Sequence, residues 1–160
     1  MNDTYDYKSL VRLLISITKA GTGKPLVEAV SAGKQPNYPF YTYDFIDTYQ
    51  PLGFTDNIEF EPFEMSLELE AHSEDNFEAI QMASSLAKLL QIQNVTLQFD
   101  RAHIYVIDVS AIEQNDNELS VQVERRAGFV LDLRVVDSFT DDVIDISDIN
   151  INGSNLPKAD

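Results

Sequence analysis

The residues of this chain that could bind a phosphate group lie in the sequence Gly21-Thr22-Gly23-Lys24. A phosphate-binding loop of this type would need glycine at position 18 and a hydroxyl residue at position 25, where the chain has Thr18 and Pro25. The segment also follows a predicted helix, whereas a phosphate loop follows a strand. We therefore interpret it as the end of that helix followed by a turn.

Carboxylates near the C-terminus could ligate a hard cation, since they gather at Asp141, Asp142, Asp145 and Asp148. They lack the spacing of a calcium-binding loop, and on a strand alternate residues face opposite sides. Charged residues at the edge of a sheet also discourage unwanted strand pairing, which gives such a cluster a structural role. We expect a solvated acidic edge and no metal site.

Nucleophilic chemistry has few candidate residues. The chain has no cysteine, and its two histidines are His72 and His103. Neither histidine has a carboxylate or hydroxyl residue nearby in the sequence at a spacing that suggests a catalytic triad. We expect both to be structural or surface residues, and we predict no catalytic residue, no cofactor and no enzyme activity.

Aromatic residues are concentrated in one segment, because nearly half of the Phe and Tyr residues lie between Tyr38 and Phe54. Flat apolar rings with hydroxyl groups fill protein cores or cover contacts between proteins. A catalytic site instead needs convergent titratable groups. This segment therefore favours packing and assembly.

The charge of the chain is strongly negative. With 27 Asp and Glu against 11 Lys and Arg, the formal net charge is −16. Such a charge opposes DNA binding by neutralisation of phosphates, and an acidic surface often serves only solubility.

The length of 160 residues fits a single domain. We see no apolar run of the roughly 20 residues that a membrane helix needs and no signal sequence, so we expect neither membrane insertion nor export by a signal peptide.

The hydrophobic periodicity predicts two helices, over residues 4–20 and 74–90. Runs of β-forming or alternating residues predict strands over residues 26–30, 40–47, 61–72, 95–99, 103–111 and 119–135. Residues 48–57 and 115–118 are predicted to be a loop and a turn. Near the end, the apolar phase changes between Ser147 and Asp148, which predicts a β-bulge, and the tail from Gly153 is expected to fray.

This order of elements predicts the α+β class: one mainly antiparallel sheet packed on one face by two helices. Residues 119–135 are apolar at every second position except Arg125. This length predicts either one long curved strand or two strands joined near Arg125, in a long β-hairpin. The other face of the sheet should be polar, with outward residues that include Glu64, Glu68, Glu70, Asp132 and Arg134.

Three arginines are candidates for contacts. Arg125 and Arg126 are adjacent, and Arg125 interrupts an otherwise apolar face. A half-buried arginine needs a carboxylate partner, which could belong to the same subunit or to a neighbour. Arg101, in a predicted connection between strands, leaves the same two alternatives open.

Three segments together resemble the neck or tail terminator proteins of long-tailed bacteriophages. They read Pro36-x-x-Pro39-Phe40-Tyr41-x-Tyr43, Glu124-Arg125-Arg126-Ala127-Gly128-Phe129 and Ile146-x-x-Ile149-x-Ile151-x-Gly153. With the predicted helix over residues 74–90 between them, the resemblance spans about residues 5 to 153.

The resemblance implies a virion protein, made in the host cytoplasm, that forms a ring, usually a hexamer, at the head-to-tail joint. Its partners would be itself, the tail tube protein and the head connector, and DNA would pass through without specific binding. The candidate subunit-interface residues are Arg101, Arg125, Arg126, Tyr41, Tyr43 and Phe129, and the candidate acidic lumen residues are Glu64, Glu68 and Glu70. The alternative is a small-molecule-binding regulatory module that acts as an oligomer.

Overall fold

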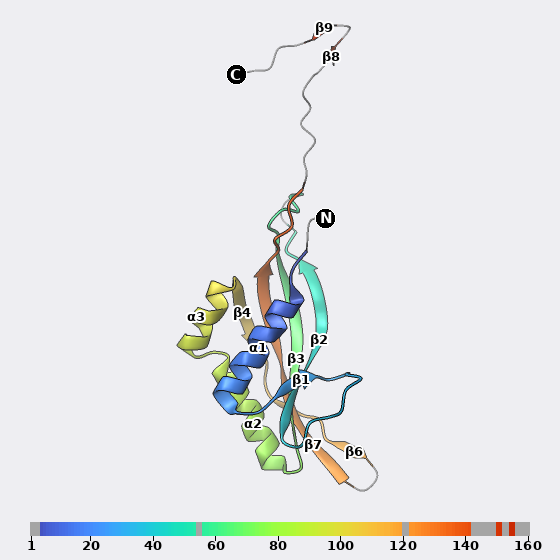
Figure 1. Ribbon diagram of the computed structural model, residues 1–160, viewed down its shortest axis with the longest axis vertical. Helices are drawn as coiled ribbons and strands as arrows, with labels where there is room; N and C mark the ends of the chain where they lie inside the picture. The colour runs from blue at the N-terminus through green and yellow to red at the C-terminus, as the bar shows by residue number, and fades with distance from the viewer. Residues whose placement is uncertain (1–3, 54–55, 120–121, 142–149, 152–153, 156–160) are drawn as a thin grey trace.

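The computed structural model is built around one sheet with helices packed against it (Figure 1). It describes residues 4–53, 56–119, 122–141, 150–151 and 154–155. The sheet order is β1 (Leu26–Glu28), β2 (Phe40–Pro51), β3 (Pro62–Ser73), β7 (Gln122–Val136) and β4 (Ile104–Val109). Two short strands, β5 (Glu113–Gln114) and β6 (Asn117–Leu119), also pair with β7. β1 pairs with β2 in parallel, and the other pairs are antiparallel.

Two of the helices begin after a capping aspartate, and the third has no side-chain cap at its start. The helices are α1 (Tyr7–Thr22), α2 (Asn76–Leu89) and α3 (Gln93–Arg101). The Asp6 carboxylate accepts the Ser9 backbone N–H at 3.1 Å before α1. At the other end, Gly23 has φ of 74°, and its N–H donates to the Lys19 carbonyl at 2.9 Å. A left-handed residue at this position ends a helix, which confirms the interpretation of the Gly21 to Lys24 segment.

Alternation along the two central strands separates the core from the outer face of the sheet. On β3, the buried residues are Phe63, Met65, Leu67, Leu69 and Ala71. The antiparallel register places Leu67 opposite Leu131 and Leu69 opposite Phe129, so β7 turns its apolar residues to the same side. The helices cover that side, and α2 contributes the buried Ala83 and Leu86. This layer is the hydrophobic core.

The outer face carries the intervening polar residues of the same strands. Glu64, Glu68 and Glu70 alternate with the core residues of β3 and are partly exposed. β3 and β7 approach closely at Gly128, where a Cβ atom would lie 2.7 Å from the Leu69 carbonyl oxygen. The predicted polar outer face is confirmed for these strands.

The structure confirms the α+β class, the mainly antiparallel sheet and the helices packed against it. β7 runs without a break from Gln122 to Val136, so the first of the two predicted alternatives, one long strand, is confirmed, and there is no division near Arg125. β6 pairs with β7 through Leu119 opposite Gln122, which forms the predicted hairpin. β2 continues to Pro51, where a loop from Thr48 was predicted.

The largest error concerns residues 95–99, which form part of α3 and not a strand. Val95 and Phe99 are buried, one helical turn apart, whereas Leu97 between them is 50% exposed. Apolar residues at positions 95, 97 and 99 fit an alternating strand, but the first and last of them also fit one face of a helix. The chain thus has a third helix in addition to the two predicted.

Near the C-terminus, β8 (Asn150–Ile151) pairs with β9 (Ser154–Asn155). The predicted tail from Gly153 therefore contains a short strand, and Figure 1 shows this pair well apart from the sheet and the helices. The predicted bulge between Ser147 and Asp148 lies outside the described residues. None of the three helices is long and apolar enough to cross a membrane within the part of the chain that the structure describes.

Candidate functional site

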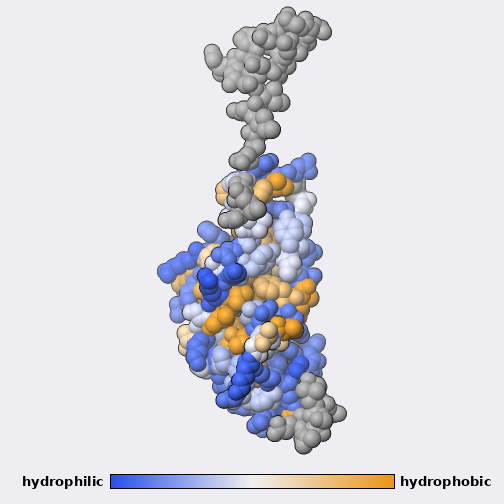
Figure 2. Space-filling model, turned by 45° about the vertical axis from the view of Figure 1, so that its right-hand side comes forward, coloured by the Kyte–Doolittle hydropathy of each residue, from blue (hydrophilic) through white to orange (hydrophobic). Residues whose placement is uncertain are grey.

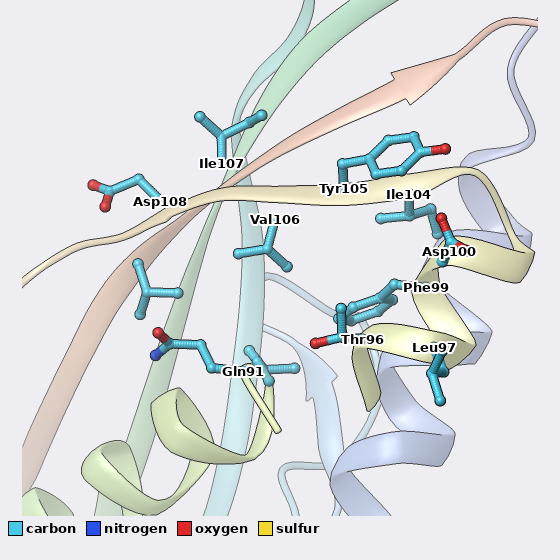
Figure 3. A pocket seen from close by; sticks show the side chains of 12 residues that line it. Gln91, Thr96, Leu97, Phe99, Asp100, Ile104, Tyr105, Val106, Ile107 and Asp108 are labelled. Atoms are coloured by element: carbon cyan, nitrogen blue, oxygen red, sulfur yellow. The ribbon is translucent and has the colours of Figure 1, made fainter. Parts of the chain in front are cut away.

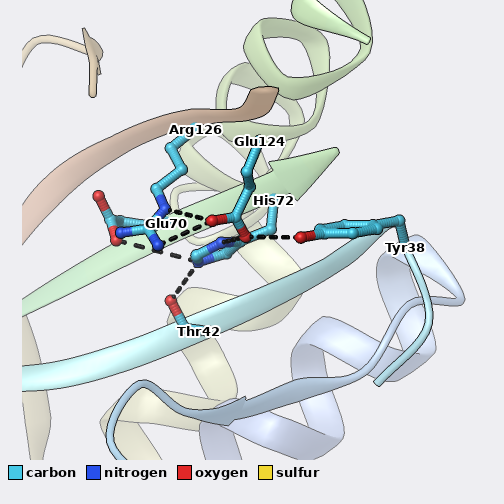
Figure 4. A network of polar contacts seen from close by, with 6 residues as sticks. All are labelled: Tyr38, Thr42, Glu70, His72, Glu124 and Arg126. Atoms are coloured by element: carbon cyan, nitrogen blue, oxygen red, sulfur yellow. Dashed lines mark hydrogen bonds and ion pairs between the residues drawn. The ribbon is translucent and has the colours of Figure 1, made fainter. Parts of the chain in front are cut away.

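A buried polar network lies on the outer face of the sheet, where β3 ends (Figure 4). At its centre, His72 Nδ1 donates to Glu124 Oε1 at 2.8 Å. The Thr42 hydroxyl lies 2.8 Å from His72 Nε2, and the Tyr38 hydroxyl donates to Glu124 Oε1 at 3.1 Å. Arg126 Nε and Nη2 donate to Glu124 Oε2 at 2.9 and 2.7 Å. One carboxylate thus collects donors from three side chains.

The pairing of three adjacent strands brings this network together. The register places Phe40 of β2 opposite His72 of β3, and His72 opposite Arg126 of β7. Because Glu124 precedes Arg126 by two residues on a strand, both side chains point to the same face. The Phe40 ring also stacks on the imidazole, with centroids 4.7 Å apart and planes at 3°. The imidazole is consequently enclosed on the face of its ring as well as at both nitrogens.

The charge of Glu124 is stabilised despite its burial. Burial alone would raise the pKa of Glu124, but the hydrogen bonds from His72 and Arg126 outweigh it and hold that pKa below its ordinary value. Because a carboxylate only accepts hydrogen bonds, His72 carries a proton on Nδ1. Nε2 has the Thr42 hydroxyl as its own hydrogen-bond partner.

The order Thr42, His72, Glu124 places a hydroxyl, an imidazole and a carboxylate in line, as in a nucleophilic triad. Two contacts oppose such a reaction. A Glu70 carboxylate oxygen lies 3.9 Å from His72 Nε2, so a negative charge stands beside the hydroxyl where acyl transfer would develop an oxyanion. Glu124 is also shared with Arg126, which reduces its effect on the imidazole. The network is better suited to holding three strands together.

The C-terminal aspartates are only partly within the described residues. Asp141 is exposed, and its backbone N–H donates to Glu59 Oε1 at 2.7 Å. Asp142, Asp145 and Asp148 lie outside the described residues, so the predicted acidic edge is untested there. In the described ranges, no cluster of His, Asp and Glu has the geometry of a metal site.

Two of the predicted interface residues lie in the core of the subunit. Tyr41 is 1% exposed, and its hydroxyl donates to the Met82 carbonyl at 3.0 Å. Burial raises the pKa of Tyr41 to about 12. Phe129 is also buried, whereas Tyr43 is only partly buried. As folded here, the Tyr41 and Phe129 side chains support the sheet from within and offer little surface to a neighbour.

The two adjacent arginines have carboxylate partners in their own subunit. Arg125 Nη1 lies 2.7 Å from Asp116 Oδ2, and Arg126 binds Glu124. Arg101 is the last residue of α3 and is exposed, because the predicted connection between strands is helical. Whether any of these arginines also contacts a neighbouring subunit stays a prediction.

The three predicted lumen residues differ in their surroundings. Glu64 Oε1 accepts from Arg134 Nη2 at 2.6 Å. Burial raises the pKa of Glu68, and the nearby carboxylates of Glu70, Asp44 and Glu113 raise it further. The middle of the outer face, around Glu68, therefore carries an excess of negative charge.

An apolar groove between α3 and β4 was not predicted, since it depends on the unforeseen helix. It encloses about 610 Å³ (Figure 3). Its lining includes Leu97, Phe99, Tyr105 and Ile107. The face shown in Figure 2 is largely hydrophilic, with hydrophobic residues gathered near its middle and a few more near its upper end.

The polar network was also missed, and no local signal could have found it. His72 lies 30 residues from Thr42 and 52 residues from Glu124. Only the register of β2, β3 and β7 brings these residues together.

The sheet has helices on one face, and its apolar edge strand β4 pairs on its outer side with no described strand; such an edge is suited to contact with another protein chain. The chain belongs to the phage neck terminator protein family, whose model matches residues 8–157. This match confirms the resemblance found in the sequence. A search of curated proteins finds no match to the chain.

Proposed function

We propose that this protein assembles as a ring, in the form of a hexamer, at the end of the phage tail tube. There it ends tail growth and provides the surface to which the head connector binds. The observation that carries the proposal is the family match over residues 8–157. On this proposal the protein has no catalytic role.

The two edges of the sheet support the proposed ring, because each has a length of strand that pairs with no further described strand. β4 pairs with β7 on one side and with no described strand on the other. At the opposite edge of the sheet, β1 pairs with β2 at Tyr41, Thr42 and Tyr43, and residues 44–51 have no pairing strand on that side among the described residues. A ring uses two different patches on each subunit, and its closure covers both.

The experiment that tests this function is deletion of the gene from the phage. We expect particles with heads separate from tails, and tails that are overlong or unjoined, because nothing would end the tube. Electron microscopy of the lysate measures both features. Tails of normal length joined to heads in the deletion phage would contradict the proposal.

We also propose that the outer face of the sheet lines the channel through which DNA passes. Negative side chains there would repel the phosphates and keep the DNA from adhering. Glu68→Lys places a cation among Glu70, Asp44 and Glu113 and should slow genome delivery without preventing assembly. Potassium efflux or DNA ejection kinetics from purified virions measure this effect.

The matched control is Glu74→Lys, which makes the same charge change at an exposed residue before α2. Delivery that is equally fast in wild-type, Glu68→Lys and Glu74→Lys virions would contradict a lumen on this face. If the Glu68→Lys protein fails to assemble into virions, so that delivery cannot be measured, Glu68 would instead belong to a contact between subunits.

One observation favours the second candidate, a small-molecule-binding regulatory module. The groove between α3 and β4 is apolar and of the volume that ligand sites commonly have. A purified protein that stays a fixed dimer and is stabilised by a metabolite would support this module over the terminator.

A further inference from the structure

We propose that residues 143–151 of one subunit dock along β4 of the next subunit and cover the groove between α3 and β4. The inference rests on the proposed ring and names the contact that would join its subunits.

The receiving surface is an edge strand with exposed apolar side chains. Leu97 of α3 and Ile107 of β4 are 50% and 46% exposed, and Tyr105 of β4 is also exposed. Figure 3 shows Leu97 on the α3 side of the groove and Tyr105 and Ile107 along β4. An unpaired strand edge accepts an added strand, and apolar side chains beside it provide the pockets that such a strand needs.

The proposed occupant has the matching composition. Residues 143–151 read Val-Ile-Asp-Ile-Ser-Asp-Ile-Asn-Ile, so five of nine residues are β-branched and apolar. Among the described residues, the end of this stretch pairs with β9, and Figure 1 shows the two strands apart from the sheet and the helices. A lone two-stranded hairpin is at best marginally stable in water, so this segment needs a surface to pack on.

The way the chain leaves the body favours a neighbour over the same subunit. After β7, the Asp137 N–H donates to the Glu61 carbonyl at 2.9 Å, and the Phe60 N–H donates to the Phe139 carbonyl at 3.1 Å. These bonds fix the exit against the residues before β3. In the sheet order, β3 lies on the opposite side of β7 from β4. Val135 of β7 lies opposite Ile104, the first residue of β4, so the described residues after Val136 run past the start of β4 and away from the groove of their own subunit.

The length of the segment is sufficient for this contact. The ten residues that follow Asp141 can extend about 33 Å at roughly 3.3 Å each. This reach is close to the diameter of a small domain, about 30 Å. The charges on both surfaces are negative, with Asp100 and Asp108 in the groove lining and Asp145 and Asp148 in the segment. The contact must accordingly be driven by apolar burial.

The absence of cysteine from the chain permits a direct test. Two single variants, Ile107→Cys and Ile149→Cys, are prepared with tags of different mass, mixed, assembled and oxidised. We expect a disulfide-linked heterodimer on a non-reducing gel, in several-fold higher yield than from the control mixture of Val30→Cys with Ile149→Cys. Val30 is 83% exposed and lies beyond β1, away from the groove. Thermal melting of each variant checks that it is folded.

A second mixture, with Ile146→Cys in place of Ile149→Cys, allows for a different alignment of the segment along β4. Equal linkage in the groove and control mixtures for both positions would overturn the inference. So would a double variant, Ile107→Cys with Ile149→Cys, that links within one chain regardless of dilution, since the segment would then occupy its own groove. If electron microscopy shows rings but the linkage is not preferential, the proposed contact is wrong and the proposed ring still stands. If deletion of the gene leaves tails of normal length joined to heads, the proposed ring function is itself wrong.

Discussion

Glu124 is the residue on which the polar network depends. It lies 8% exposed and binds His72, Tyr38 and Arg126. Buried charges are tolerated when they are paired and hydrogen-bonded, and loss of one partner leaves the others unsatisfied. The Glu124 carboxylate of β7 thus joins this strand to β3, through His72, and to the segment before β2, through Tyr38.

We predict that Glu124→Gln lowers the free energy of unfolding at neutral pH by about 1–3 kcal/mol, since Arg126 and His72 lose a charged acceptor. The pKa of Glu124 is lower in the folded protein than its ordinary value of 4.5. The carboxylate therefore contributes stability that is present above pH 4.5 and is lost as the pH falls through the folded pKa. The difference between variant and wild type should shrink in acid. Urea unfolding at a series of pH values measures it.

The control for this variant is Glu74→Gln, at an exposed glutamate before α2. It should change stability little at any pH. A Glu124→Gln effect that stays constant down to acid pH would show that packing, and not charge, is what Glu124 contributes.

At the scale of single residues, features that depend on the local backbone were predicted from the sequence, and features that depend on strand pairing were not. Gly23 was correctly assigned to a helix end, because helix termination depends on local backbone geometry. The partners of His72 and the burial of Tyr41 were not predicted, because both depend on which strands lie side by side. Spacing in one sequence carries no register between distant strands.

Among the elements, β3 was predicted almost to its ends, and α3 was not. In β3 the alternation of acidic and apolar residues has one interpretation, since a helix would mix the two on every face. In α3 the buried Val95 and Phe99 satisfy both periods, and only the exposed Leu97 distinguishes them in the structure. The unforeseen helix also forms one wall of the groove, so the groove could not be predicted either.

The close approach of β3 and β7 gives a prediction at this scale. Gly128→Ala would place a Cβ 2.7 Å from the Leu69 carbonyl oxygen and 2.8 Å from Glu70 Cγ. Because a backbone atom cannot move without disturbing the ladder, we expect a loss of about 1–3 kcal/mol in the free energy of unfolding. Thermal melting should show a midpoint lower by several degrees.

Gly33→Ala provides the matched control, because the nearest atom to its added Cβ is the Ser31 hydroxyl oxygen at 3.3 Å. That side chain is exposed and can rotate, so the melting temperature should remain near that of the wild type. Equal melting of the Gly128→Ala variant and the wild type would show that the two central strands can separate slightly at no cost.

The net charge of −16 acts on the molecule as a whole. Identical subunits of this charge repel one another, and salt screens that repulsion over a Debye length of about 10 Å at 0.1 M. We therefore predict that self-association strengthens as the salt concentration rises from low to physiological. Sedimentation velocity at fixed protein concentration measures the assembled fraction. Association that weakens with added salt would show that complementary charges hold the subunits together.

The hydrogen bonds that tie Asp137 and Phe139 to the residues before β3 have a mechanical consequence. Tension applied to the C-terminus would enter β3 and β7 together, at the same end of the sheet. The two central strands would then share the load and resist it in shear, whereas an untethered β7 would be peeled away one bond at a time. On the proposed function, this resistance to shear would suit a protein held between a phage head and its tail.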